Sequence, residues 1–527
     1  MKRVQSTPSP VSTERLITQA GLASAFCYGL LSLPTVALLA ICVHSGVDPS
    51  RLIENAWRPW RLWTGVSGGI AEEVLMDGAL FAIIGASAVI YFWLARRVMR
   101  QESALTLGSG DASRLFKHAI AWNAGLGVLL LVTVPFDSSD LYGYINRGAQ
   151  QAFYGLNPYV APLAHTPGWA ADPMFHAHWV ENPSPYGPLF TRFVQGICLI
   201  SGRRFWLAFL LMKLSALTLH LFNCWMLWKL AQRWGLARPW LPSLLYGWHP
   251  LMLLQMIANG HNDLWVSAGL LAALWLLTTQ RYAAGALPAI MVSALTKYAS
   301  LMALPLTALM DIRHKRWRSL MIGALTCVLA LIVLAGPYLQ DMAIVGWPKM
   351  AQNAVMAQHS IHSALGRVVF YAGRWVPALR GWDDTTRQAL RIVTLLAFVG
   401  LYGWALRRFW RELACLPSAV LSSQRLAYWI MLLLTAFLAL ASAKFHAWYL
   451  GMIFPLYLIT PVQNGLWDWP RRFGLMLAAF QLLSFTSLNN IHILNFLLLT
   501  ATPLILSYRA ARAEQKASPA NDSLALQ

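Results

Sequence analysis

Residues 135–193 read PFDSSDLYGYINRGAQQAFYGLNPYVAPLAHTPGWAADPMFHAHWVENPSPYGPLFTRF. This stretch interrupts a strongly apolar chain with two closely spaced carboxylates, clustered histidines, several prolines and many aromatic residues. Long apolar runs stand on both sides of it. Ionisable residues are costly at a membrane boundary and need a reason to be there. The stretch therefore predicts a loop that carries chemistry at a membrane surface, held there by the rest of the chain.

The composition supports a membrane protein. Of 527 residues, 57% are hydrophobic and 12% are charged, whereas soluble proteins carry about 25% charged residues. The 25 Trp and 17 Tyr suit a membrane protein, because amphipathic rings settle at the headgroup level. The six cysteines form no CxxC pair and most lie in apolar segments. They predict neither a disulfide framework nor a metal site.

The lengths of the apolar runs predict an all-α polytopic integral membrane protein with about 14 transmembrane helices. Residues 188–202 are apolar but short, which favours a re-entrant or interfacial helix. A single catalytic domain is expected over residues 16–512, between a tail of residues 1–15 and a disordered tail of residues 513–527. The predicted spans are 16–43, 74–94, 119–134, 205–228, 241–257, 264–279, 283–295, 300–310, 319–335, 389–406, 428–441, 449–459, 473–487 and 491–507.

The distribution of Lys and Arg predicts the orientation. The N-terminus and the linker 96–117 are basic and are expected on the cytoplasmic side. The loop 135–193 and a second long loop, 337–387, then face away from the cytoplasm. Most other basic clusters fall on the cytoplasmic side, so the net charge of +20 reflects orientation and contact with anionic membrane lipids. Nucleic acid is not an expected partner, and the cell membrane is the expected location, with a multi-pass chain.

Asp137 and Asp140 are the candidate catalytic residues. At a spacing of three they would share one face of a helical turn, although Asp137 could instead cap the turn that follows. Asp140 is the stronger candidate because it opens the segment Asp-Leu-Tyr-Gly-Tyr-Ile-Asn-Arg-Gly.

Further polar residues are predicted on the same outer face and suggest a shared substrate site. Lys297 and Lys444 stand beside apolar runs, where a lysine must reach outward or hold an anion. His261 and Asp263 start a helix, where Asn262 or Asp263 could simply be its N-cap. The predicted substrate-binding and donor phosphate-binding residues are Lys297, His261, Asp263, His446, Lys444, Asn157, Tyr159 and Tyr186.

The histidine-rich half of the loop raises the question of a metal. His165, His176, His178 and Glu181 offer zinc ligands by type, but their spacing matches no helical zinc motif. No metal and no cofactor are expected. Contact with a sugar or a lipid headgroup, or interfacial placement, is the preferred interpretation of these side chains.

Several motifs together resemble a known family. DLYGYINRGAQQAFYGLNPYVAP at 140–162 followed by SPYGPL at 184–189 resembles the GT-C polyprenyl-phosphate-mannose-dependent mannosyltransferases, in particular the actinobacterial α-1,6-mannopyranosyltransferases of lipomannan synthesis and their α-1,2 relatives. NGHNDLW, SALTKYASLMALP and KFHAWYLGMIFPL resemble later landmarks of the same family. The resemblance covers roughly residues 119–460 and implies a GT-C-like fold. It also implies Asp140 as the base and Lys297 or His261 as contacts of the donor phosphate.

The predicted function is transfer of a sugar, mannose by the resemblance, from a polyprenyl-phosphate donor to a lipid-linked or envelope glycan acceptor. A sugar on a lipid phosphate has a good leaving group, so one carboxylate base and fixed cations suffice. A single base implies inversion. The alternative is a multi-pass transporter or flippase for a lipid or polar solute, which would place its polar residues near the membrane midplane.

Overall fold

The computed structural model describes residues 10–45, 70–101, 109–341, 358–485 and 492–517. Within these ranges the chain is helical and forms no β-strand; one isolated parallel bridge joins Gln358 to Lys444. The chain divides into two compact units, Met1–Leu264 and Trp265–Gln527, which are described separately below. The single catalytic domain expected over residues 16–512 stays a prediction.

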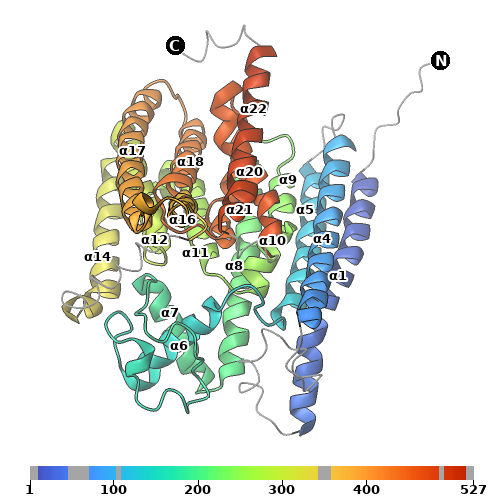
Figure 1. Cartoon of the computed structure of the whole chain (residues 1–527). Helices are drawn as coiled ribbons and strands as arrows, with labels where there is room; N and C mark the ends of the chain where they lie inside the picture. The colour runs from blue at the N-terminus through green and yellow to red at the C-terminus, as the bar shows by residue number, and fades with distance from the viewer. Residues whose placement is uncertain (1–9, 46–69, 102–108, 342–357, 486–491, 518–527) are drawn as a thin grey trace. The chain divides into compact units, whose positions relative to one another are not determined.

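The first unit combines long apolar helices with a helical pair formed by the loop. The long helices α1, α4 and α5 pack beside one another, and α8 packs on α5 (Figure 1). The helices α6 and α7 pack together. The helices of this unit are α1 (Pro10–Ser45), α4 (Ile70–Gln101), α5 (Ser109–Leu131), α6 (Asp140–Tyr154), α7 (Pro188–Ser201), α8 (Phe205–Arg233), α9 (Leu241–Gly247) and α10 (Pro250–Met252), with a 3-10 turn at Leu163–His165 and a π-helical turn at Leu253–Ala258.

Local sequence explains how α6 and α7 begin and end. α6 ends at Gly155, whose φ of 66° is the left-handed conformation that glycine adopts without a steric penalty. α7 starts with Pro188 in its first turn, where the missing N–H costs nothing, and ends at Gly202 with φ 58°. The short helix predicted at 188–202 is confirmed.

The second unit contains helices that pack on neighbours in the chain, such as α16 on α17, and on more distant helices, such as α20 on α22. Glu412 accepts hydrogen bonds from Arg425 at 2.6 Å and Arg408 at 2.9 Å, which ties α17 to α18. The helices are α11 (Asp263–Leu277, which starts at the boundary), α12 (Ala286–Ala294), α13 (Ala303–Arg313), α14 (Trp317–Asp341), α16 (Ile361–Ala372), α17 (Trp382–Leu413), α18 (Ala419–Ala436), α19 (Phe454–Ile459), α20 (Trp469–Phe480), α21 (His492–Phe496) and α22 (Thr502–Ala517), with 3-10 turns at Gln280–Gly285, Tyr298–Met302, Pro377–Leu379, Ala447–Met452, Gly465–Asp468 and Gln481–Phe485 and π-helical turns at Phe437–Ala441 and Leu497–Ala501.

Seven helical stretches in the described part of the chain are long and apolar enough to cross a membrane, and α7 and α11 are shorter apolar helices. The chain therefore has the helices of a membrane protein. The span predicted at 241–257 was wrong as one continuous helix, because it is broken into α9, α10 and a π-helical turn around Trp248 and His249. Prolines at 242 and 250 start the first two pieces, since proline cannot continue a helix that precedes it.

The terminal helices extend into both predicted tails. α1 begins at Pro10 and α22 continues to Ala517, so residues 10–15 and 513–517 are helical. The remaining tail residues, 1–9 and 518–527, lie outside the described residues, as do residues 342–357 of the second predicted outer loop.

Gly148 permits the close packing of α6 on α7. A Cβ atom at this position would stand 2.6 Å from Val194 Cγ1 and 2.8 Å from the Val194 carbonyl oxygen. Both distances are far below van der Waals contact, and backbone cannot move aside as a flexible side chain can.

We expect Gly148→Ala to separate α6 from α7 and to destabilise the protein by about 1–3 kcal/mol, the usual cost of overpacking. The measurement is the thermal midpoint of the purified protein in detergent. Gly196→Ala in α7 is the matched control, because a Cβ there meets nothing within 4 Å. A midpoint for Gly148→Ala equal to that of the control would contradict the close-packing account.

Candidate active site

A buried lysine holds the end of α5, where the loop begins. Lys213 of α8 has no accessible surface. Its amino group donates to the carbonyl of Leu130 at 2.8 Å and to the carbonyl of Thr133. The last carbonyls of a helix lack helical partners, so this donor satisfies groups that would otherwise stay unpaired. Thr35 of α1 accepts from the amide of Val134 at 3.2 Å. The backbone therefore leaves α5 in a fixed direction.

A second anchor holds the residues that follow. The side-chain oxygen of Asn259 accepts from the backbone amides of Phe136 at 2.9 Å and Asp137 at 3.4 Å. Its amide nitrogen donates to Gln255 at 2.9 Å, and Gln255 donates to the Asp137 carboxylate at 2.7 Å. Gln255 and Asn259 are fully buried. Asp137 thus has its backbone and its carboxylate held by one short segment.

The environment of Asp137 favours its neutral form. Loss of hydration raises the pKa of this carboxyl to about 7, and the hydrogen bond from Gln255 opposes that shift. At neutral pH a carboxyl with this pKa is about half protonated.

Asp140 has a different partner. Its carboxylate lies 3.5 Å from Nδ1 of His261, whose side chain is fully buried, whereas the Asp140 side chain is 20% exposed. Asp140 is the first residue of α6, and its backbone amide donates to Ser138 at 3.1 Å. A carboxylate at a helix N-terminus is stabilised by the helix dipole. The site therefore offers one accessible carboxylate oriented by a buried imidazole.

The predicted relation between the two carboxylates was wrong in its geometry. Helix α6 starts at Asp140, so Asp137 lies in the bend before it and the two do not share a helical face. Asp137 does not cap the helix either, because Ser139 occupies the N-cap position. The two carboxylates also have different partners. Gln255 donates to Asp137, and His261 lies beside Asp140.

Gly260 allows one segment to reach both carboxylates. It has a φ of 75°, a left-handed conformation that glycine adopts freely. The turn reverses the chain between Asn259 and His261. A Cβ at Gly260 would meet Leu141 Cδ2 at 3.1 Å, so this backbone also packs directly on the first turn of α6.

Helix α6 is the scaffold of the loop, and its residues 141–151 are buried. Gln150 donates to the carbonyls of residues 161 and 162, both at 3.1 Å, and to the Thr166 hydroxyl at 3.0 Å. Asn146 exchanges two hydrogen bonds with the backbone of His176, at 2.8 and 3.0 Å. Arg147 donates to the carbonyls of Trp179, at 2.8 Å, and Asn182. Burial lowers the pKa of its guanidinium to about 10, which leaves it charged at neutral pH.

Three predicted binding residues are used within this loop. The Asn157 side chain accepts from the amide of Tyr159 at 3.0 Å, which forms an Asx turn. The hydroxyl of Tyr159 donates to the carbonyl of Tyr186 at 2.8 Å. The Tyr186 ring packs edge-on against Tyr144 at 4.8 Å. These contacts shape the loop, and the substrate-binding role of the three residues stays a prediction.

The loop histidines that the structure describes do not form a metal-binding cluster. His176 is buried against Phe205, with ring centroids 4.3 Å apart, whereas His165 and Glu181 are exposed. Among the residues that the structure describes, no group of three or more His, Cys, Asp or Glu is placed to hold a metal ion. Asp263 is buried in the first turn of α11, and its neighbour Asn262 accepts from the Tyr144 hydroxyl at 3.4 Å.

The second unit brings predicted basic residues together around aromatic rings. The ammonium of Lys297 lies 4.3 Å from the Tyr449 ring centroid. His446 lies 5.4 Å from the same ring and stacks on Trp448 at 4.2 Å. Lys444 takes part in the backbone bridge to Gln358. Lysine and histidine donors held in this way can bind an anion such as a phosphate.

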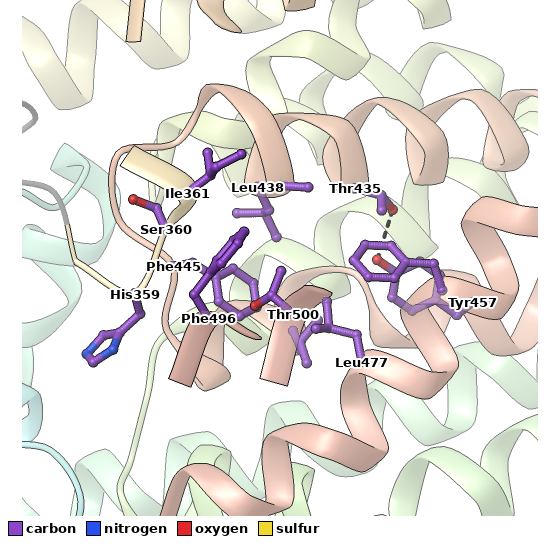
Figure 2. A pocket seen from close by; sticks show the side chains of 13 residues that line it. His359, Ser360, Ile361, Thr435, Leu438, Phe445, Tyr457, Leu477, Phe496 and Thr500 are labelled. Carbon is purple, nitrogen blue, oxygen red and sulfur yellow. Dashed lines mark hydrogen bonds between the residues drawn. The ribbon is translucent and has the colours of Figure 1, made fainter. Parts of the chain in front are cut away.

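A hollow in the same unit is an unsuitable place for the base. Figure 2 shows apolar side chains, among them Leu438, Phe445 and Leu477, between His359 at one end and the hydrogen bond of Thr435 with Tyr457 at the other. That bond is 2.8 Å long. No carboxylate is among the residues that line the hollow. Asp137 and Asp140 of the first unit stay the predicted catalytic residues.

The comparisons with known proteins show which family the chain belongs to. The sequence model of the family "Alpha-(1->6)-mannopyranosyltransferase, N-terminal domain" matches residues 28–313. The match covers more than half of the chain and includes both carboxylates, His261 and Lys297. The chain belongs to this family. It is therefore a mannosyltransferase, which agrees with the predicted family and enzyme class and not with a transporter.

Individual relatives give the same result. Alpha-(1->6)-mannopyranosyltransferase A of Mycobacterium tuberculosis is 25% identical over 73% of this chain and 72% of its own length. A second alpha-(1->6)-mannopyranosyltransferase of that organism is 32% identical over 25% of this chain and 23% of its own length. Alpha-(1->6)-mannopyranosyltransferase B of Corynebacterium glutamicum is 23% identical over 37% of this chain and 33% of its own length. No solved structure matches the chain.

Sequence reasoning missed the residues of this mannosyltransferase that hold its carboxylates. Lys213 is a single lysine inside the apolar run 205–228, and Gln255 and Asn259 stand at the end of the run 241–257. An isolated polar residue inside an apolar run was the available signal. It indicates a buried partner, but a sequence does not say which.

We expect the stability of the mannosyltransferase to depend on pH through Asp137. A carboxyl whose pKa rises from 3.8 to about 7 on folding binds its proton more readily in the folded state. Its contribution to the free energy of unfolding therefore falls as pH rises from about 4 to about 7. The measurement is the thermal midpoint of the wild type and Asp137→Asn between pH 4 and pH 8.

The wild type should lose stability relative to Asp137→Asn over this range. Gln255→Leu removes the donor that favours the charged carboxylate. Its thermal midpoint should therefore fall more than that of the wild type as the pH approaches 8. Parallel curves for the wild type and Asp137→Asn would contradict the raised pKa.

We expect Lys213→Met to loosen the end of α5, because two buried carbonyls lose their donor. The thermal midpoint should fall by an amount that corresponds to about 1–3 kcal/mol. Sugar transfer should fall by about 100-fold, the effect of a displacement of about 1 Å at reacting groups. Lys229→Met, at the far end of the same helix, is the control. Equal thermal midpoints and equal transfer rates for Lys213→Met and this control would contradict the anchoring role of Lys213.

Proposed function

We propose that the protein transfers a mannosyl residue from a polyprenyl-phosphate donor to a glycan or lipid-linked acceptor, with Asp140 as the base. The observation that carries the proposal is the accessible Asp140 carboxylate at the start of α6, 3.5 Å from the buried His261, within the part of the chain that the family model matches.

The proposed chemistry is a single displacement. Asp140 takes the proton of an acceptor hydroxyl, and that oxygen forms a bond to the anomeric carbon while the bond to the phosphate oxygen breaks. The products are the mannosylated acceptor and polyprenyl phosphate. One displacement inverts the anomeric configuration, and the phosphate leaves without a general acid. A well-placed base contributes about 100- to 10,000-fold to such a rate.

His261 is proposed to orient the base. Its side chain is fully buried and its Nδ1 faces Asp140, so it limits the rotation of the carboxylate. The distance of 3.5 Å is long for a hydrogen bond and keeps the imidazole in contact with the carboxylate. Its predicted contact with the donor phosphate is compatible with this arrangement, since the imidazole has a second ring nitrogen.

Asp137 is proposed to support the site without acting as the base. Its carboxylate already accepts from Gln255, and a pKa of about 7 leaves about half of the molecules without its charge at neutral pH. A second negative charge beside Asp140 would repel an anionic donor. A partly neutral Asp137 reduces that repulsion.

The basic cluster of the second unit is proposed to bind the donor phosphate. Lys297 and His446 lie around the Tyr449 ring, and Lys444 is two residues from His446 in the chain. Fixed cations stabilise the charge that develops on a departing phosphate.

The setting of the reaction is part of the proposal. The fold is proposed to be GT-C-like, with about 14 membrane crossings when short and interrupted helices are counted. The basic residues at positions 96–117 support an orientation in which the loop 135–193 faces away from the cytoplasm. The location would then be the cell membrane, where both a polyprenyl donor and a growing envelope glycan can reach the loop.

The test is a donor screen with purified protein in detergent or nanodiscs. Polyprenyl-phosphate mannose, polyprenyl-phosphate glucose and GDP-mannose are each offered with an α-1,6-linked mannooligosaccharide, and products are detected by mass. The expected product is one hexose longer and forms from polyprenyl-phosphate mannose alone. Transfer from GDP-mannose would overturn the proposed donor.

We expect Asp140→Asn to reduce this transfer by at least about 100-fold with an unchanged thermal midpoint, because the amide cannot accept the proton. Asp137→Asn, a change of the same type three residues away, is the matched control and should lose much less. Equal losses in the two variants would mean that both carboxylates are needed. Full activity of Asp140→Asn would exclude it as the base.

A further inference from the structure

Trp179 is an exposed aromatic residue held in an uncommon conformation beside the candidate base. Its side chain is 52% exposed, and its backbone has a φ of 55°. A bulky residue with positive φ is a genuine outlier in proteins. Such strain persists only where surrounding contacts impose it, and it is concentrated at functional sites. The conformation therefore calls for an explanation beyond packing.

Two sets of hydrogen bonds impose this position. The backbone carbonyl of Trp179 accepts from the Arg147 guanidinium at 2.8 Å and from the amide of Asn182 at 3.2 Å. The indole N–H donates to the hydroxyl of Ser139 at 3.1 Å. Ser139 is the N-cap of α6 and directly precedes Asp140. One edge of the indole is thus fixed next to the carboxylate residue, while half of the side chain remains open.

The orientation differs from that of a lipid anchor. A tryptophan that anchors a protein at the membrane interface directs its N–H toward headgroups and water. The N–H of Trp179 is instead directed to the first turn of α6. The neighbouring His178 is half-buried against the Tyr142 ring at 5.4 Å, so the chain next to Trp179 also packs on α6.

We propose that Trp179 is the stacking platform for a pyranose ring of the acceptor glycan at Asp140. This inference rests on the proposed function and names the part of the site that receives the acceptor. One face of a mannopyranose carries mainly C–H groups, which carry partial positive charge and pack on the electron-rich face of an indole. The hydroxyl groups project from the edges of the sugar ring. A sugar on Trp179 can therefore direct one hydroxyl toward Asp140 while its apolar face is bound.

The fixed indole also has an energetic advantage. The indole is already held by its bond to Ser139, and its backbone by Arg147, so the side chain loses little conformational freedom when it binds a sugar. A freely rotating tryptophan would lose more. The strain at φ 55° is thus compensated by contacts that exist before the acceptor arrives.

The test separates binding of the acceptor from binding of the donor. Trp179→Ala and Trp179→Phe are compared with the wild type in steady-state transfer from polyprenyl-phosphate mannose. Trp179→Ala should raise the KM for the mannooligosaccharide by about tenfold, which is about 1.4 kcal/mol, with little change in the KM for the donor. Trp179→Phe keeps a ring and should retain most of the affinity. Trp375→Ala, at a tryptophan that is 87% exposed, is the control and should change neither constant.

A second measurement does not need turnover. Saturation-transfer NMR with an α-1,6-linked mannotriose and no donor should show signals from the sugar C–H protons for the wild type and for Trp179→Phe, and weak ones for Trp179→Ala. If the wild type binds mannotriose through Trp179 but uses no polyprenyl-phosphate donor, the proposed donor is wrong and the platform remains. If Trp179→Ala raises only the KM for the donor, or binds mannotriose as the wild type does, the acceptor platform is wrong.

Discussion

The candidate site depends on how the backbone is satisfied where it leaves α5. A helix that ends among apolar neighbours has carbonyl and amide groups without partners, and each one left unpaired costs about 1–3 kcal/mol. Lys213 supplies the donors for the carbonyls of Leu130 and Thr133. Asn259 supplies the acceptor for the amides of Phe136 and Asp137. Lys213 comes from α8 and Asn259 follows the π-helical turn Leu253–Ala258, and the residues that they hold have little freedom. Asp140 therefore begins α6 at a defined place relative to His261.

The sequence predicts a helical membrane protein, which the structure supports, and it predicts Asp140 as the base, because both predictions rest on direct signals. Apolar runs predict membrane helices by length alone, and Asp140 stands where an apolar run gives way to a polar motif. The short helix after Tyr186 was found for the same reason. The sequence could not predict which buried side chains make hydrogen bonds with which distant backbone groups. Lys213 is 83 residues from Leu130, and Asn259 is 123 residues from Phe136, and no local pattern relates such partners. The break near Trp248 was missed because the run 241–257 is continuously apolar, and apolarity does not distinguish one helix from three pieces.

Position in the sequence also did not show what the polar residues of the loop do. Asn157 and Tyr159 were predicted to bind substrate, which stays a prediction, and the structure shows that their side chains also make hydrogen bonds within the loop. His176 was a possible ligand by residue type and is a packed aromatic ring in the structure. The sequence does not distinguish Trp179 from the other tryptophans among the 25 of the chain. Exposure and backbone conformation are properties of the folded chain alone. Side chains of the same type thus take structural or chemical roles according to which partner they reach.

Helix α6 holds the loop mainly through bonds to backbone atoms. Gln150, Asn146 and Arg147 donate to carbonyls of residues 161, 162, 176, 179 and 182. A backbone carbonyl is present whatever side chain its residue carries. The shape of the loop is therefore specified largely from the helix. Substitutions of exposed side chains in residues 155–187 leave these bonds in place, so the surface of the loop can change in chemistry while its backbone path is kept.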